Sequence, residues 1–132
     1  MTVIEDILNN SKVVAIVGLS GKKERPSYEV GSYLKEHGYR IIPVNPAEKE
    51  ILGEKSYPDL ESIPEKIDVV DIFRRSEEVL PIVRQAIKIG AKAVWMQEGV
   101  VNKEAAAEAR AAGLKVVMDK CMHKQHVKLH GG

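Results

Sequence analysis

The sequence is poor in several features that mark particular classes of protein. It has a single cysteine, Cys121, among 132 residues, so it forms no intrachain disulfide and a reducing compartment is expected. Aromatic residues make up only 5% of the chain, and Trp95 is the single tryptophan. No apolar run approaches the roughly 20 residues that a membrane-spanning helix needs, and the first ten residues lack the layout of a signal peptide. We therefore expect a cytoplasmic protein with no membrane contact.

An excess of charge of either sign is also missing. Charged residues account for 30% of the chain, yet the formal net charge is only +1. This balance is not typical of proteins that hold nucleic acid by bulk charge, so we expect no nucleic-acid partner. The hydrophobic content of 44% is sufficient for one core. Without a linker, repeat or low-complexity tract, the sequence predicts one domain over residues 1–132.

Short apolar runs alternate with helical patterns along the chain. Strands are predicted at residues 13–17, 40–44, 67–73, 93–96 and 114–118. Helices are predicted at residues 3–8, 27–37, 76–89 and 103–112, with one or two further helical turns around residues 59–63. Asn102 is predicted to cap the last of these helices, and Gly31 to let the second helix pack closely on the first strand. The alternation predicts an α/β fold, a Rossmann-like doubly wound parallel sheet of about five strands in three α/β/α layers. Pro43 cannot donate to a ladder and is expected on an edge strand.

The clearest chemical signal follows the first predicted strand. That strand ends at Gly18, a polar loop comes next, and a helix opens near Pro26 and Ser27. Backbone N–H groups and the positive end of a helix dipole then come together, which suits a phosphate. The loop also carries three cations, Lys22, Lys23 and Arg25. Its spacing is not G-x-G-x-x-G, and a solvated basic loop beside a tight turn is the alternative.

The end of the second predicted strand bears on which nucleotide is bound. An NAD site needs a carboxylate there for the ribose 2′-hydroxyl. The chain has Val44-Asn45-Pro46 instead, with no acid before Glu48, which disfavours NAD. NADP would favour an arginine at this point, and none is present. Asn45-Pro46 serving only as a turn is the alternative.

Further polar residues follow the later strands. Arg74 and Arg75 follow the third strand, and one of them is expected to face a ligand. The alternative is a surface ion pair with Glu77 and Glu78. Trp95 stands at the end of the fourth predicted strand and begins a segment of candidate ligand contacts that extends to Gly99. The alternative is that Trp95 only fills the core. In the tail, Cys121 is a candidate thiol near a ligand. The tail residues Cys121, His123, His126 and His130 match no standard zinc spacing, so we expect a polar terminal helix and no metal. No nucleophile–base set or carboxylate pair stands out, and no catalytic residue is assigned.

Several segments together resemble a known family. They are AIVGLSGKKERPSYEVGSYL, GYRIIPVNP, ILGEKSYPDL, VDIFRRSEE, AVWMQEGVVNKEAA and AGLKVVMDKCM. In this order and spacing the chain resembles the small CoA-binding-domain proteins, which are related to the CoA-binding domain of the succinyl-CoA synthetase α subunit. The resemblance covers nearly the whole chain.

This resemblance implies a Rossmann-type domain that binds coenzyme A or an acyl-CoA. The residues that would hold the phosphates are Gly18, Ser20, Lys23, Arg25, Pro26 and Ser27. Those that would contact the adenine and ribose are Val44, Asn45 and Pro46. Those that would line the pantetheine arm are Phe73, Arg74, Trp95, Gln97 and Gly99.

We therefore expect a non-catalytic CoA-binding carrier, sensor or regulator. One alternative is an NAD(P)-dependent oxidoreductase, and another is an acyl-CoA ligase or transferase component that needs a partner subunit. A third is a thiol-redox role in which Cys121 forms a mixed disulfide with CoA. The tail histidines do not match the context of the phosphorylated histidine of succinyl-CoA synthetases, so ligase activity is not expected. A homodimer or an unidentified protein partner stays open.

Overall fold

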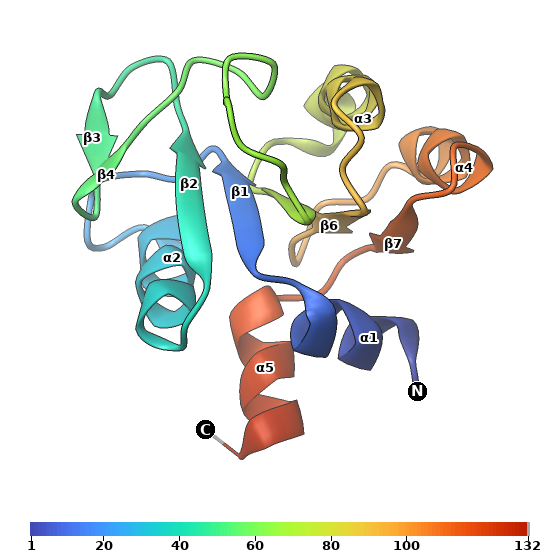
Figure 1. Cartoon of the computed structure of the whole chain (residues 1–132), viewed down its shortest axis with the longest axis horizontal. Helices are drawn as coiled ribbons and strands as arrows, with labels where there is room; N and C mark the ends of the chain where they lie inside the picture. Colours follow the sequence, from blue (N-terminus) through green and yellow to red (C-terminus); the bar gives the residue numbers. More distant parts are fainter. Residues whose placement is uncertain (132) are drawn as a thin grey trace.

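A five-stranded parallel sheet forms the centre of the computed structural model, which describes residues 1–131 (Figure 1). The strands lie in the order β2-β1-β5-β6-β7, and every neighbouring pair is parallel. Their bounds are β1 Val13–Val17, β2 Arg40–Val44, β5 Val69–Ile72, β6 Ala93–Met96 and β7 Lys115–Val117.

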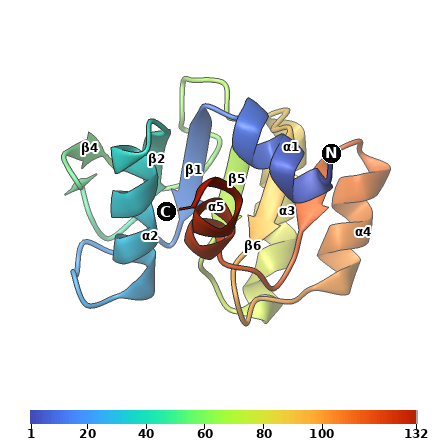
Figure 2. The same cartoon turned by 90° about the horizontal axis from the view of Figure 1, so that it is seen from below.

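Helices cover both faces of this sheet (Figure 2). On one face lie α1 Val3–Asn10, α2 Pro26–Glu36 and α5 Met122–His130. On the other face lie α3 Val79–Lys88, which follows a short 3-10 turn at Ser76–Glu78, and α4 Lys103–Ala111. The predicted three-layer, Rossmann-like α/β fold is therefore confirmed. None of the helices in residues 1–131 has the length and apolar character that crossing a membrane requires.

The apolar run of β1 is buried on both faces because successive side chains point to opposite sides of a strand. Ala15 and Val17 pack in the core beneath α3 and α4. Val14 and Ile16 pack in the second core, beneath α1, α2 and α5. The unbroken hydrophobicity of this segment thus reflects a strand with a helical layer on each side.

The strand order reverses between β1 and β5. From β1 the chain runs outward to β2, then crosses back over β1 to reach β5. Ligands of open α/β sheets bind outside the carboxyl ends of the strands at such a switch point. The same topology puts β2 at the edge of the sheet, which confirms the position expected for Pro43.

The segment between β2 and β5 differs from the prediction. The helical turns predicted at residues 59–63 are wrong, because these residues form only bends and a turn. Asp59 accepts hydrogen bonds at its Oδ1 from the Ser62 N–H and Oγ, at 2.9 and 2.7 Å. Pro64 follows directly and disfavours a helical conformation at Ile63. The structure instead has a small antiparallel hairpin, β3 Glu50–Ile51 and β4 Glu54–Lys55, which was not predicted.

Two local predictions about helices can be compared with the structure. Asn102 caps α4, since its side chain accepts a hydrogen bond from the Ala105 N–H at 2.9 Å. Gly31 lies inside α2, where a Cβ would approach Leu19 to 2.9 Å and Leu52 to 3.2 Å. Glycine therefore lets α2 pack closely on the side chain of Leu19, two residues after the end of β1.

Asp71 is an acidic side chain in the middle of the sheet. It lies in register with Ile16 and Trp95 and is 0% exposed. Neither of its carboxylate oxygens has a hydrogen-bond partner among the described residues. Burial raises the pKa of this carboxyl well above its usual range, because a charge is costly to remove from water.

Replacing Asp71 with Asn is expected to stabilise the fold at alkaline pH, because the amide has a similar volume and no charge. Because the pKa of Asp71 is raised in the folded state, its carboxyl contributes its full stability at pH values below its unfolded pKa, near 3.8. That contribution is lost as the pH rises through the pKa of the folded state. The gain in the free energy of unfolding should be about 1–3 kcal/mol at pH 8 and shrink as the pH approaches 4. Urea denaturation across this range measures it, and a pH-independent difference would contradict the raised pKa.

Candidate functional site

Gly18 is the point at which the ends of β1, β2 and β5 meet. Its N–H donates to the Val44 carbonyl at 2.9 Å, and the Phe73 N–H donates to the Val17 carbonyl at 2.8 Å. Gly18 has a φ of +87°, and a Cβ there would lie 2.4 Å from the Phe73 carbonyl oxygen. Only glycine fits both the backbone conformation and this close approach.

The hydroxyl groups of two serines hold the loop from β1 to α2 in shape by accepting hydrogen bonds from its backbone. The Ser20 N–H donates to Ser27 Oγ at 3.0 Å, and the Lys22 N–H donates to Ser20 Oγ at 3.1 Å. Both serines that were predicted to hold phosphates therefore shape the loop. The Gly21 N–H, in contrast, donates to an acceptor from outside the loop, Glu48 Oε2, at 2.9 Å.

Positive charge gathers where this loop enters α2. Arg25 is the N-cap residue and makes no side-chain capping bond, and Pro26 takes the first helical position. The three loop cations are exposed and take part in no ion pair within residues 1–131: Lys22, Lys23 and Arg25. Their charge and the helix dipole act together on this surface, which favours an anion.

Asn45 ties the end of β2 to the same loop. Its Nδ2 donates to the Leu19 carbonyl at 3.0 Å, and its Oδ1 accepts from the Ala47 N–H at 2.9 Å. The side chain thus fixes the position of two loops, as the turn alternative held. Its neighbours differ in exposure, since Val44 is buried and Pro46 is exposed.

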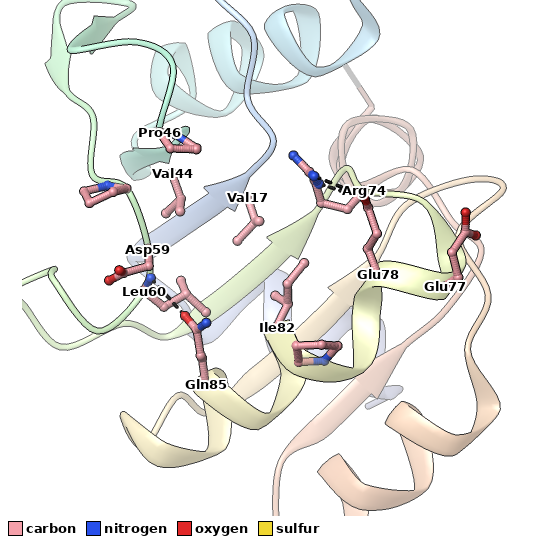
Figure 3. Close-up of a pocket in the computed structure, with 12 residues that line it drawn as sticks. Val17, Val44, Pro46, Asp59, Leu60, Arg74, Glu77, Glu78, Ile82 and Gln85 are labelled. Atoms are coloured by element: carbon pink, nitrogen blue, oxygen red, sulfur yellow. Dashed lines mark hydrogen bonds and ion pairs between the residues drawn. The ribbon is translucent and has the colours of Figure 1, made fainter.

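Two cavities open along the carboxyl ends of the strands. The first, which we call the α3-side cavity, has a volume of about 440 Å³ and lies between the end of β2 and α3 (Figure 3). Its apolar lining includes Val17, Val44, Pro46, Leu60 and Ile82. The second, the α5-side cavity, has a volume of about 480 Å³. It is lined by Pro26, Val30, Phe73, Arg74, Arg75, Gln97, Glu98, Gly99, Val100 and Cys121.

Arg74 lines both cavities. Its Nε donates to Glu78 Oε2 at 3.0 Å, so the expected surface ion pair is present (Figure 3). The guanidinium holds the pKa of Glu78 below its usual value. Since 44% of its side chain is exposed, Arg74 also keeps donors available to an anion.

The end of β6 and the turn that follows it are divided between the core and the α5-side cavity. Trp95 is 0% exposed and donates from Nε1 to the Lys120 carbonyl at 2.8 Å, so it belongs to the core and lines neither cavity. Gln97 lines the α5-side cavity, and its Oε1 accepts from the Met122 N–H at 3.1 Å. Gly99 lines it too, with a φ of +81°.

Cys121 ends this wall of the α5-side cavity. It is 8% exposed and precedes the first residue of α5. The predicted polar terminal helix is therefore present, and its beginning brings the thiol to the candidate site.

The four histidines of the chain gather between α2 and α5 instead of around a metal. The Tyr33 ring stacks between His37 and His123 at 3.9 and 3.8 Å, and the Tyr33 hydroxyl lies 2.7 Å from His126 Nδ1. His130 packs against His126 at 4.5 Å. Burial lowers the pKa of His126. Within residues 1–131 no group of side chains has a metal-binding arrangement.

The contribution of Glu48 was missed from the sequence. It lies 27 positions from Gly21, and only the fold brings its carboxylate to that amide. The only sequence signal for the position of Glu48 was the Asn45-Pro46 turn at the end of β2. In the structure the Glu48 N–H donates to the Asn45 carbonyl of this turn at 3.4 Å. The α3-side cavity was also missed, since Leu60 and Ile82 come from segments with no chemical motif.

Comparisons with solved structures agree with this fold. A hypothetical protein from Pyrococcus horikoshii OT3 superposes with a TM-score of 0.94 at 46% identity, covering 98% of this chain and 92% of that one. A protein from Thermus thermophilus superposes with a TM-score of 0.92 at 30% identity, covering 98% and 99% of the two chains.

Among curated proteins, the uncharacterized protein YneT of Bacillus subtilis is 40% identical over 93% of this chain and 91% of its own length. The α subunit of acetate–CoA ligase (ADP-forming) II from Pyrococcus furiosus is 27% identical over 89% of this chain, but only 28% of that subunit is matched. The model of the CoA binding domain matches residues 12–127. The chain therefore belongs to the family of CoA-binding-domain proteins.

Proposed function

We propose that the chain binds coenzyme A or an acyl-CoA across the carboxyl edge of its sheet, and that it acts as a carrier, sensor or regulator and not as a catalyst. The observation that carries the proposal is the position of Arg74. It lies on the wall of both cavities, so one long ligand would pass it on the way from one cavity to the other.

The chemistry of the surface fits the parts of such a ligand. The exposed cations of the β1–α2 loop, which form no ion pair within residues 1–131, and the start of α2 suit its phosphates. The apolar α3-side cavity, with Val44 and Pro46 on its wall, suits the adenine and ribose end. The α5-side cavity, with Gln97 and Gly99, suits the pantetheine arm and its amides. Trp95 has no direct part in this arrangement because it is buried in the core.

We propose no catalytic role because polar side chains near the cavities are bonded to other groups of the protein. The Gln97 side chain is bonded to the start of α5, and Glu78 is paired with Arg74. Within residues 1–131, Cys121 is the only thiol or hydroxyl side chain in the two cavity linings, and the carboxylate of Glu98 in the same lining accepts a hydrogen bond from Lys124 Nζ at 2.9 Å. The match to the ligase subunit covers only 28% of that subunit, so the similarity does not extend to most of the ligase.

Replacing Lys23 or Arg25 with Ala is expected to weaken CoA binding about tenfold, or roughly 1.4 kcal/mol, because each removes a charged phosphate donor. Isothermal titration calorimetry measures the change. Lys12→Ala is the matched control, since Lys12 is also exposed but precedes β1 at the opposite edge of the sheet, and it should bind as the wild type does.

The same titrations separate the proposed function from its main rival. A wild-type protein that gives no heat with CoA or acyl-CoA would sink the proposal. A change of NADPH fluorescence on mixing with the protein would instead support the oxidoreductase.

The location of Cys121 favours a second candidate function, a thiol-redox role. In this reaction the Cys121 thiolate attacks one sulfur of CoA disulfide. A Cys121–CoA mixed disulfide forms, the original disulfide bond breaks, and the second CoA leaves as a thiolate. The thiol lies on the wall of the cavity that suits the pantetheine arm, so the reacting sulfur atoms would be brought together.

Incubation with CoA disulfide is expected to add one CoA moiety to the wild-type protein, measured as intact mass, and dithiothreitol should remove it. Cys121→Ser is the matched control and should gain no mass. An unmodified wild-type protein, under conditions in which calorimetry shows CoA binding, would rule out the redox role and leave the carrier or sensor role standing.

A further inference from the structure

Glu48 and Gly21 form a contact that the proposed function does not use. The Gly21 N–H donates to Glu48 Oε2 at 2.9 Å, across 27 positions of the chain. Glu48 lies between the end of β2 and the hairpin, and its residue is half-buried. The amide belongs to the loop that was assigned to phosphate binding on independent grounds.

Gly21 lies close against the carboxylate of Glu48. Its φ is not in the left-handed region, so the backbone conformation alone would accept another residue. A Cβ at Gly21 would lie 2.8 and 2.9 Å from the two carboxylate oxygens of Glu48. Glycine here leaves room for an oxyanion close to the backbone, which is a common reason for glycine beside a ligand.

The amide of Gly21 also differs from its neighbours in how it is bonded. The N–H groups of Ser20 and Lys22 are bonded to serine hydroxyls, which hold the loop in shape. A ligand that took those amides would break the hydrogen bonds that hold the loop in shape. The amide of Gly21 could change acceptors by a rotation of the Glu48 side chain alone.

The charges around Gly21 favour replacement of the Glu48 carboxylate by a bound anion. Glu48 has no ion-pair partner within residues 1–131, although three cations lie in the loop beside it. A phosphate would take the same amide and bring more negative charge to those cations. It would also be repelled by Glu48 as long as the carboxylate stayed in place.

We infer that Glu48 is a specificity-determining residue, a built-in competitor for the phosphate group carried on the ribose of the ligand. The inference rests on the proposed function, since it assigns one part of the CoA molecule to one group. The ribose-linked phosphate is favoured over the pyrophosphate because Glu48 follows β2, and the adenine and ribose end of the ligand is assigned to that strand. Glu48 thereby sets how strongly CoA is preferred over dephospho-CoA, which lacks this phosphate.

The test compares Glu48→Gln with the wild type in calorimetric titrations with CoA and with dephospho-CoA. The amide oxygen of glutamine still accepts from Gly21, so the loop should be retained and the melting temperature should change little. Removal of the like charge is expected to tighten CoA binding about three- to tenfold. Binding of dephospho-CoA should change less than twofold, on the order of the effect of a distant surface charge.

Glu24→Gln is the matched control because Glu24 is an exposed acid in the same loop and forms no ion pair within residues 1–131. It changes the net charge equally and should leave the ratio of the two affinities as it is in the wild type. If Glu48→Gln and Glu24→Gln raised the affinity for CoA equally, the cause would be a general charge effect, and the role of Glu48 would be overturned.

The remaining outcomes are distinguishable. Weaker binding of both ligands by Glu48→Gln would overturn the inference and show that the carboxylate accepts a ribose hydroxyl. Unchanged affinities, with CoA still bound, would overturn the inference alone. If neither the wild type nor the variant binds CoA, the proposed function fails and the inference fails with it.

Discussion

The close approach of Gly18 to the carbonyl of Phe73 is the constraint on which the candidate site depends. Any side chain at this position would collide with the backbone that follows β5, at 2.4 Å. Because Gly18 also donates to Val44, one residue holds the ends of three strands together. The carboxyl edge at the switch point is therefore narrow at its centre, with a cavity on each side of it. Arg74 lies where these cavities adjoin, which makes the edge suitable for a long, bent ligand.

Most of the small polar side chains near this edge maintain its shape. Ser20 and Ser27 accept hydrogen bonds from backbone amides of the β1–α2 loop, Asn45 donates to the backbone of that loop, and Gln97 is bonded to the start of α5. The long cationic side chains of the β1–α2 loop stay exposed. Shape and charge are thus supplied by different residues. A rigid arrangement of backbone amides lowers the entropic cost of holding a phosphate, and mobile lysine and arginine side chains add attraction without fixed geometry.

The sheet and its helices could be predicted because their signals are local. The buried run Val13–Val17, the cap at Asn102 and the alternation of strands with helices all appear within short windows of sequence. The hairpin at Glu50–Lys55 and the turn at Asp59 could not, because two-residue strands and a proline-flanked turn leave no periodic pattern. Position near the end of a strand also did not distinguish Trp95, which packs in the core, from Gln97, which reaches a cavity. The contact of Glu48 with Gly21 depends on a distant loop and needed the structure.

The glycines of the chain provide the most direct test of where a ligand binds. Gly18, Gly21 and Gly99 lie at the carboxyl edge of the sheet, whereas Gly38, Gly90 and Gly113 follow helices and precede strands, at the amino edge. The decisive measurement is a titration of ¹⁵N-labelled protein with CoA, followed by the glycine amide resonances. If CoA binds at the carboxyl edge, the resonances of the first three glycines move and those of the last three stay in place. Shifts confined to the amino-edge glycines, or no shift at any of the six, would contradict binding at the carboxyl edge.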